Sequence, residues 1–214
     1  MRSNRQNRSH AGFTLFELLV VIALISIMAT MATPNFLRLI QRSKLTGISQ
    51  ETSLLLRMAR DYAIRYNTET VVRFDLNTSE VIAFVEVDGV LPGDPGDRIF
   101  NPIAGSPHRS TDWELARYQL PSRVTFDAPA ADPPPCTGTP ICLFTPVAGE
   151  NVAVFQPNGS ADTRGAIRFA DPFGNFLQVR VEPAATGRVR IEKFHDADVR
   201  WYFRNENNKP WEWK

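Results

Sequence analysis

The most uneven stretch of the chain lies near its start, where a basic segment is followed by a long apolar run. Residues 1–12 carry three arginines and one histidine but no acidic residue. Residues 15–33 are almost entirely apolar and are interrupted only by Glu17, Ser26, Thr30 and Thr33. A helix needs about 20 apolar residues to span a bilayer, and basic residues favour the cytoplasmic side. The pattern therefore predicts a membrane helix over residues 13–34 with a cytoplasmic N-terminus.

Three residues in this region are unusual for a simple anchor. Glu17 places a carboxylate in the apolar run, at a cost of roughly 2.5–3.5 kcal/mol at mid-bilayer on insertion scales, which marks it as a candidate functional residue. Pro34 removes one helical hydrogen bond and is expected to bend the helix. Gly12 precedes the apolar run, unlike the cleavage site of a secretory signal, so cleavage after it would leave the helix on the mature protein.

The helical pattern continues beyond Pro34 as an amphipathic segment over residues 35–66. Apolar positions recur at helical spacing, and charged residues fall between them. The apolar positions are Leu45, Ile48, Leu55, Met58, Tyr62 and Tyr66. We expect one long helix, bent near Pro34, whose second half lays this stripe on a β-sheet as core packing.

After residue 67 the pattern changes to short runs of β-forming residues. Seven runs are predicted as strands: Thr70–Phe74, Glu80–Val87, Val124–Phe126, Val152–Gln156, Ala166–Ala170, Leu177–Glu182 and Arg188–Phe194. Residues 88–112 and 127–150 are rich in Gly and Pro and are expected to form irregular surface loops. The predicted fold class is α+β, with the long helix packed on an antiparallel β-domain over residues 67–194 and a tail over 195–214.

The N-terminal residues resemble those of the type IV pilin superfamily, which includes pilins of type IV pili and pseudopilins of type II secretion. The matching residues are Gly12, Phe13, Thr14, Leu15, Glu17, Leu18, Leu19, Val20 and Pro34, whereas Phe16 stands where Ile or Val is commoner. The resemblance implies that a prepilin peptidase cuts between Gly12 and Phe13, removes residues 1–12 as a leader and methylates the new amine. It also implies that Glu17 pairs with the N-terminal amine of a neighbouring subunit, which is physically reasonable because two desolvated charges are tolerated best together.

The C-terminal half narrows the resemblance to the GspH/FimT branch, which holds the minor pseudopilin H of type II secretion and the FimT and FimU minor pilins. The residues behind it are Phe155 to Ala161, Gly165 to Phe169, Gly174-Asn175, Val179 to Val181 and Gly187 to Ile191. The resemblance implies a non-enzymatic subunit of the bacterial inner membrane with a periplasmic domain. Such a subunit assembles with other pilins or pseudopilins on an inner-membrane platform and helps to start a filament near its tip. Membership of a secretion system or of a pilus stays open.

Charge and cysteine content add two constraints. The net charge is +1, and removal of the leader leaves 21 basic against 23 acidic residues, so bulk charge indicates no nucleic-acid partner. Cys136 and Cys142 are the two cysteines of the chain. A disulfide is favoured in an exported domain and is worth about 2 kcal/mol for so short a loop, with free thiols or half of a metal site as alternatives.

No catalytic constellation is evident, and we expect neither an enzyme nor a cofactor. The histidines His10, His108 and His195 lie at spacings typical of neither a metal site nor a catalytic triad. Asp88, Asp94 and Asp97 surround Gly-Pro turns but match no calcium-loop pattern, so a solvated loop is favoured over a calcium site.

The segment Gly187-Arg188-Val189-Arg190 is the candidate binding motif. Residues two apart on a strand share a face, so Arg188 and Arg190 are expected to form a phosphate clamp that Arg180 and Arg168 could widen. In FimT-like minor pilins a GRxR motif is associated with DNA binding during natural transformation, which is the alternative function implied here. Glu182 and Glu192 lie nearby and could instead neutralise the arginines.

The tail after residue 194 is rich in aromatic residues: Trp201, Tyr202, Phe203, Trp211 and Trp213. Three interpretations remain open for it. The favoured one is an edge strand with an anchor for a partner subunit; the others are core packing and stacking on single-stranded nucleic acid.

Overall fold

The structure is a computed structural model that describes residues 13–86, 98, 112–132, 134–147, 150–204, 206 and 210–214. The chain divides into two compact units, Met1–Ile40 and Gln41–Lys214. The helix α1, Leu15–Tyr66, is continuous through the end of the first unit and the start of the second. The two units are therefore described separately.

The described part of the first unit is the beginning of α1, and its apolar side chains are exposed. Phe13, Leu15 and Phe16 are 78%, 82% and 75% exposed, and exposed apolar side chains recur as far as Leu39. No single helix among the described residues meets both the length and the apolarity needed to cross a membrane. The bent pair Leu15–Thr30 and Thr33–Tyr66 meets them together, by length and composition.

The break in this pair lies between Thr30 and Thr33, one turn or less before Pro34, which lies inside α1. Proline has no N–H, so the carbonyl of Thr30, four residues earlier, lacks its usual helical donor. The hydroxyl groups of Thr30 and Thr33 add bonds of 2.7 Å to the carbonyls of Ile27 and Ala29. Such back-bonding often accompanies helix bending.

Among the residues that the structure describes, the second unit has eleven strands arranged in two antiparallel sheets. The first sheet has the order β3-β2-β1-β7-β6. Its strands are β1 Thr70–Asp75, β2 Glu80–Val85, β3 Trp113–Gln119, β6 Thr145–Val147 and β7 Glu150–Phe155. The second sheet has the order β11-β10-β9-β8-β4, and β5 also pairs with β8. Its strands are β4 Thr125–Phe126, β5 Ile141–Cys142, β8 Gly165–Ala170, β9 Phe176–Val181, β10 Val189–His195 and β11 Arg200–Phe203.

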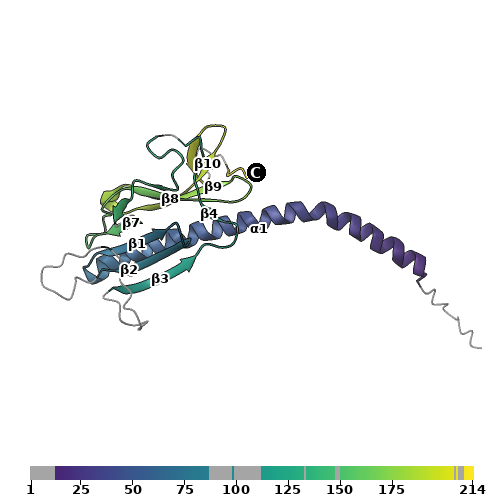
Figure 1. Cartoon of the computed structure of the whole chain (residues 1–214), viewed down its shortest axis with the longest axis horizontal. Coiled ribbons are helices and arrows are strands. Elements are labelled where there is room, and N and C mark those ends of the chain that lie inside the picture. Colours follow the sequence, from purple (N-terminus) through teal and green to yellow (C-terminus); the bar gives the residue numbers. More distant parts are fainter. Residues whose placement is uncertain are drawn as a thin grey trace, which may run out of the picture. The chain divides into compact units, whose positions relative to one another are not determined.

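The C-terminal half of α1 packs on both sheets and joins them in one core (Figure 1). Leu45, Ile48, Leu55 and Leu56 of the helix belong to one buried cluster with residues of both sheets. The sheet residues of the cluster include Val72, Phe74, Ala153, Phe155, Ile167, Phe169, Leu177, Val179 and Val181. The predicted α+β class, with a long helix on an antiparallel β-domain, is confirmed.

Two parts of the helix and strand prediction need correction. Tyr62 and Tyr66 do not enter the core: Tyr66 stacks on Tyr62, and both rings meet the edge of Trp113, with Tyr66 49% exposed. Four strands were not predicted: β3, β5, β6 and β11. Three of them, β3, β6 and β11, lie at sheet edges, where one side of the strand faces no neighbour and hydrophobic alternation is weak.

Candidate functional site

The start of α1 holds the residues implicated in processing and assembly. The backbone N–H of Glu17 donates to Oγ1 of Thr14 at 3.2 Å, and that of Leu18 donates to the Thr14 carbonyl at 3.2 Å. Thr14 and Glu17 thus have the spacing of a capping box, and a carboxylate is favoured near the positive end of a helix. Phe13 and Glu17 are both exposed, whereas Gly12 lies outside the described residues.

A groove of about 1010 Å³ lies between α1 and the start of β10. Four of its lining residues are arginines: Arg57 and Arg60 from α1, and Arg188 and Arg190 from the GRVR segment. No acidic residue lines the groove in the part of the chain that the structure describes. The groove is therefore a concentrated patch of positive charge on a domain whose overall charge is nearly balanced.

The four arginines that line the groove differ in their contacts. Nη2 of Arg57 donates to the carbonyl of Val189 at 3.3 Å, and Nε of Arg60 donates to the carbonyl of Gly159 at 2.9 Å. The guanidinium of Arg190 lies 4.8 Å from the ring centre of Phe203, and Arg188 is exposed. Each helix arginine uses one donor on the backbone, and a guanidinium has five, so donors remain for an anionic ligand.

The expectation that Arg180 and Arg168 widen the clamp is wrong. Arg180 lies directly opposite Arg190 in the β9–β10 pairing, but its Nη1 binds Glu182 at 2.9 Å and its Nε lies 3.6 Å from Glu192. These two carboxylates neutralise Arg180 outside the groove. Sequence reasoning missed Arg57 and Arg60, although their spacing of three residues puts them on one helical face.

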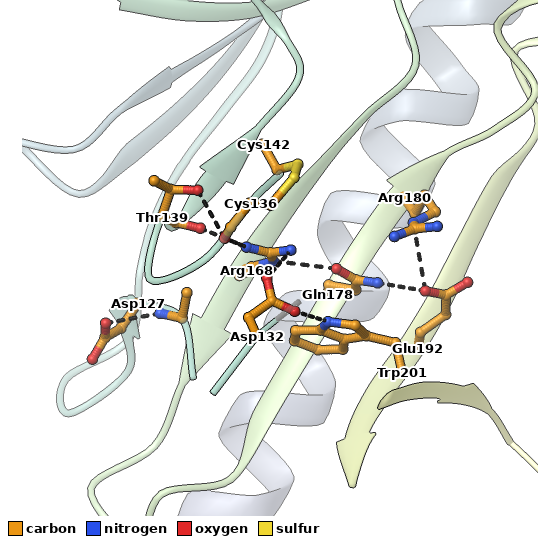
Figure 2. A network of polar contacts seen from close by, with 11 residues as sticks. Asp127, Asp132, Cys136, Thr139, Cys142, Arg168, Gln178, Arg180, Glu192 and Trp201 are labelled. Carbon is orange, nitrogen blue, oxygen red and sulfur yellow. Dashed lines mark hydrogen bonds and ion pairs between the residues drawn. A yellow bond between two sulfur atoms is a disulfide. The ribbon is translucent and has the colours of Figure 1, made fainter. Parts of the chain in front are cut away.

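Arg168 is only 1% exposed and holds the disulfide loop onto β8 (Figure 2). Its Nη1 donates to the carbonyls of Cys136 and Thr139 at 2.7 and 2.8 Å, and its Nη2 lies 2.5 Å from Asp132. Burial lowers the pKa of Arg168, and the Asp132 carboxylate opposes that change. Cys136 and Cys142 form a disulfide in the structure. The loop that this disulfide closes contains both carbonyl groups that accept from Arg168.

The same network continues across β9 to β10 (Figure 2). Nε of Arg168 donates to Gln178 at 3.3 Å, and Gln178 donates in turn to Glu192. Burial raises the pKa of Glu192, while Arg180 and Gln178 act in the opposite direction. These side chains are partnered within the domain and form a structural link between the disulfide loop and the strand that carries Arg190.

The aromatic tail packs on its own domain. Trp201 Nε1 donates to Asp132 at 2.7 Å, and Trp211 and Trp213 pack against the main core cluster. The tail therefore combines two of the three interpretations: β11 is an edge strand, as the favoured one expected, and Trp211 and Trp213 pack on the core, while an interface with a partner subunit stays a prediction.

Other candidates from the sequence add no site. Asp88, Asp94, Asp97, His10 and His108 lie outside the described residues. Over the described ranges, no group of three or more His, Cys, Asp or Glu side chains is arranged to hold a metal ion.

Models of known protein families match two parts of the chain. Residues 7–33 match the model of the prokaryotic N-terminal methylation motif, and residues 49–187 match that of the type II transport protein GspH. No curated protein matches the chain in sequence. The solved structures that are similar in fold include two minor subunits of bacterial filaments. The minor pseudopilin EpsH of the Vibrio cholerae type 2 secretion system is 12% identical, with a TM-score of 0.44 over 69% of this chain and 95% of that one. The type IV minor pilin FimU of Pseudomonas aeruginosa is 14% identical, with a TM-score of 0.40 over 71% and 90%.

Proposed function

The chain belongs to the family of the type II transport protein GspH, and we propose that it is a minor subunit that helps to initiate a type II secretion pseudopilus or a type IV pilus near the filament tip. In this proposal it is a non-enzymatic, single-pass protein of the bacterial inner membrane, with its N-terminus in the cytoplasm and residues 67–194 in the periplasm. Its partners are a prepilin peptidase, the inner-membrane assembly platform and other pilins or pseudopilins.

The observation that supports this function best is the exposed apolar start of α1 with one carboxylate in it. Phe13 to Leu39 present large apolar side chains to the surroundings, an area that water-soluble monomers rarely expose. Glu17 is the single acidic residue of that stretch. A carboxylate placed there is costly in lipid or in a helix bundle unless a cation meets it. The methylated amine of Phe13 on a neighbouring subunit would be that cation.

The test is to replace Glu17 with alanine. We expect Glu17→Ala to leave processing after Gly12 and membrane insertion intact, because neither step needs the charge pair, and to abolish incorporation into filaments. The measurement is the mass of the N-terminal peptide, the amount in the membrane fraction and the amount in sheared filaments. Glu51→Ala is the matched control, because Glu51 is an exposed acid on the same helix but outside the apolar run. Normal incorporation of Glu17→Ala would refute the mechanism.

A second function, DNA binding, is favoured by the arginine groove. Arg188 and Arg190 line it together with Arg57 and Arg60, and guanidinium groups bind phosphates in a bidentate manner. In this proposal the subunit presents the groove to DNA phosphates, as the GRxR resemblance implies. Glu182 and Glu192 form their ion pairs with Arg180, and Glu192 also interacts electrostatically with Arg190.

DNA binding is tested by its dependence on salt. If Arg188 and Arg190 each contact a phosphate, the Arg188→Ala/Arg190→Ala variant should bind more weakly, and its slope of log K against log [salt] should be smaller by about 2. The measurement is titration of the detergent-solubilised chain with duplex DNA at several salt concentrations. Arg180→Ala serves as the control, since it removes an arginine that lies outside the groove. If the double variant keeps the salt slope of the wild type, the DNA-binding proposal is refuted. The structural role in filament assembly is then the remaining proposal.

A further inference from the structure

Phe203, the last residue of β11, is an aromatic residue that lines the arginine groove. The guanidinium of Arg190 lies over its ring, 4.8 Å from the ring centre. Of the five aromatic residues of the tail, all of which the structure describes, Phe203 is the one that lines the groove. We name Arg190 and Phe203 together the stacking platform.

The pairing of β10 and β11 explains why the stacking platform lies at the groove. β11 pairs with residues 192–195 of β10, and the pairing ends at Phe203. Residues 189–191 of β10 therefore have β9 as their only paired neighbour among the described strands. Arg57 donates to the Val189 carbonyl along this free edge. The groove thus follows an edge of the second sheet and includes the aromatic ring that ends β11.

Phe203 differs from the other aromatic residues of the tail in what its ring does for the fold. Trp211 and Trp213 pack against the main core cluster, and Trp201 donates to a buried carboxylate. Within the described part of the chain, Phe203 belongs neither to a core cluster nor to the apolar residues packed against the main one, and it is partly exposed. Its backbone N–H donates to Glu206 at 2.9 Å. The ring is therefore held in place by the strand and is not part of the core.

Two carboxylates lie close to the stacking platform but do not line the groove. Glu192 is the cross-strand neighbour of Phe203. It forms its ion pair with Arg180 and interacts electrostatically with Arg190. Glu206 accepts from the backbone of Phe203. The described lining of the groove therefore combines four guanidinium groups and one aromatic ring without a carboxylate.

A positively charged groove with an aromatic ring in it has the two features of sites that bind single-stranded nucleic acid. Guanidinium groups bind the phosphates of the backbone, and bases stack on aromatic rings or on the guanidinium planes of arginines. In a duplex the bases are already stacked on one another, and taking one out of the stack costs free energy. A duplex can therefore use the arginines alone, whereas a single strand can use the arginines and the stacking platform.

We propose that the arginine groove is a site for single-stranded DNA, with phosphates on the arginines and one base on the stacking platform. The proposal rests on the DNA-binding function proposed above and specifies the form of DNA that the site prefers. Stacking of one base should strengthen binding about fivefold or more. It should do so for any sequence, because every base has a π-face.

The experiment compares three DNA probes that carry the same number of phosphates: a thymidine oligomer, an oligomer of stable abasic nucleotides and a duplex. Binding of each probe to the full chain in uncharged detergent micelles is measured by fluorescence anisotropy. The wild type should bind the thymidine oligomer about fivefold or more tightly than either other probe, because only this probe offers both phosphates and unpaired bases.

The variant Phe203→Leu keeps an apolar side chain but removes the π-face. It should bind the thymidine oligomer as weakly as the abasic oligomer, and its unchanged affinity for the abasic oligomer reports that the arginines are still in place. Phe203→Tyr keeps the π-face and should retain the difference between these two probes. Trp113→Leu is the matched control and should retain it as well, because Trp113 is a 55% exposed aromatic residue of the first sheet that does not line the groove.

Three results would overturn the single-strand proposal and leave the DNA-binding function standing. They are equal affinity of the wild type for the thymidine and abasic oligomers, equal or tighter binding of the duplex, and a preference for thymidine that survives in Phe203→Leu. A wild type that binds none of the three probes would overturn the DNA-binding function and the single-strand proposal together.

Discussion

Gly187 shows how one residue shapes the arginine groove. It ends the short 3₁₀ helix Ala184–Thr186 with a φ of 55°, in the left-handed region that favours glycine. A Cβ at this position would lie 2.7 Å from the Gly159 carbonyl oxygen and 3.1 Å from Cδ of Arg60. The absence of a side chain lets Arg60 pass beneath the GRVR segment and reach Gly159. The glycine of the motif therefore positions an arginine that the motif itself does not contain.

Gly187→Ala is accordingly expected to lower the free energy of unfolding by about 1–3 kcal/mol. Alanine is strained at this positive φ, and its Cβ would force the Arg60–Gly159 contact to shift. The measurement is urea unfolding of the β-domain in the detergent-solubilised chain. Gly47→Ala is the control: it lies in α1 with nothing within 4 Å of the added Cβ, and alanine should stabilise a helix there by about 0.5–1 kcal/mol. Equal effects of the two substitutions would contradict this account of Gly187.

The disulfide loop and β8 illustrate interactions between elements. The loop from Asp132 to Cys142 contributes two carbonyls and one carboxylate to Arg168 of β8. The backbone of Arg168 also donates to the carbonyl of Pro140 at 2.9 Å. A buried guanidinium is tolerated only while its partners stay in place. The disulfide therefore stabilises more than a short loop, because it also keeps the acceptors of Arg168 in position.

This leads to a prediction for the Cys136→Ser/Cys142→Ser variant. Its unfolding free energy should fall by more than the roughly 2 kcal/mol of loop entropy, because Arg168 then loses fixed acceptors. A double-mutant cycle with Arg168→Met isolates that contribution: the two changes together should cost less than the sum of each alone. Strict additivity, measured by urea unfolding, would show that the disulfide and Arg168 act independently.

At the scale of the whole molecule, the two units have opposite surface properties. The second unit buries its apolar residues in a core of its own, whereas the described part of the first unit leaves them exposed. A segment of that kind needs lipid or other helices around it. The proposed charge partner of Glu17 lies on another copy or on a relative of the chain. The effect of replacing Glu17 should therefore be measured as filament assembly rather than as folding stability.

The sequence by itself determined those features that depend on local pattern. The apolar run of residues 15–33 and the helical spacing of Leu45, Ile48 and Leu55 predict α1. Alternating β-formers predict the inner strands such as β1 and β9, because a strand with neighbours on both sides must be apolar enough to be buried. The GRVR segment likewise identified Arg188 and Arg190, since residues two apart share a face of a strand.

Only the tertiary structure decided which charges meet. Arg57 and Arg60 join the groove from more than a hundred residues away, while Arg168 and Arg180 are bound to Asp132, Glu182 and Glu192. The edge strands β3, β6 and β11 and the contacts of the Trp213 ring with Arg42 and Lys193 were likewise not evident from local pattern. The physical reason is the same in each case. A charge or an edge strand is stabilised by its neighbours in space, and which residues become neighbours depends on the tertiary structure rather than on the local sequence.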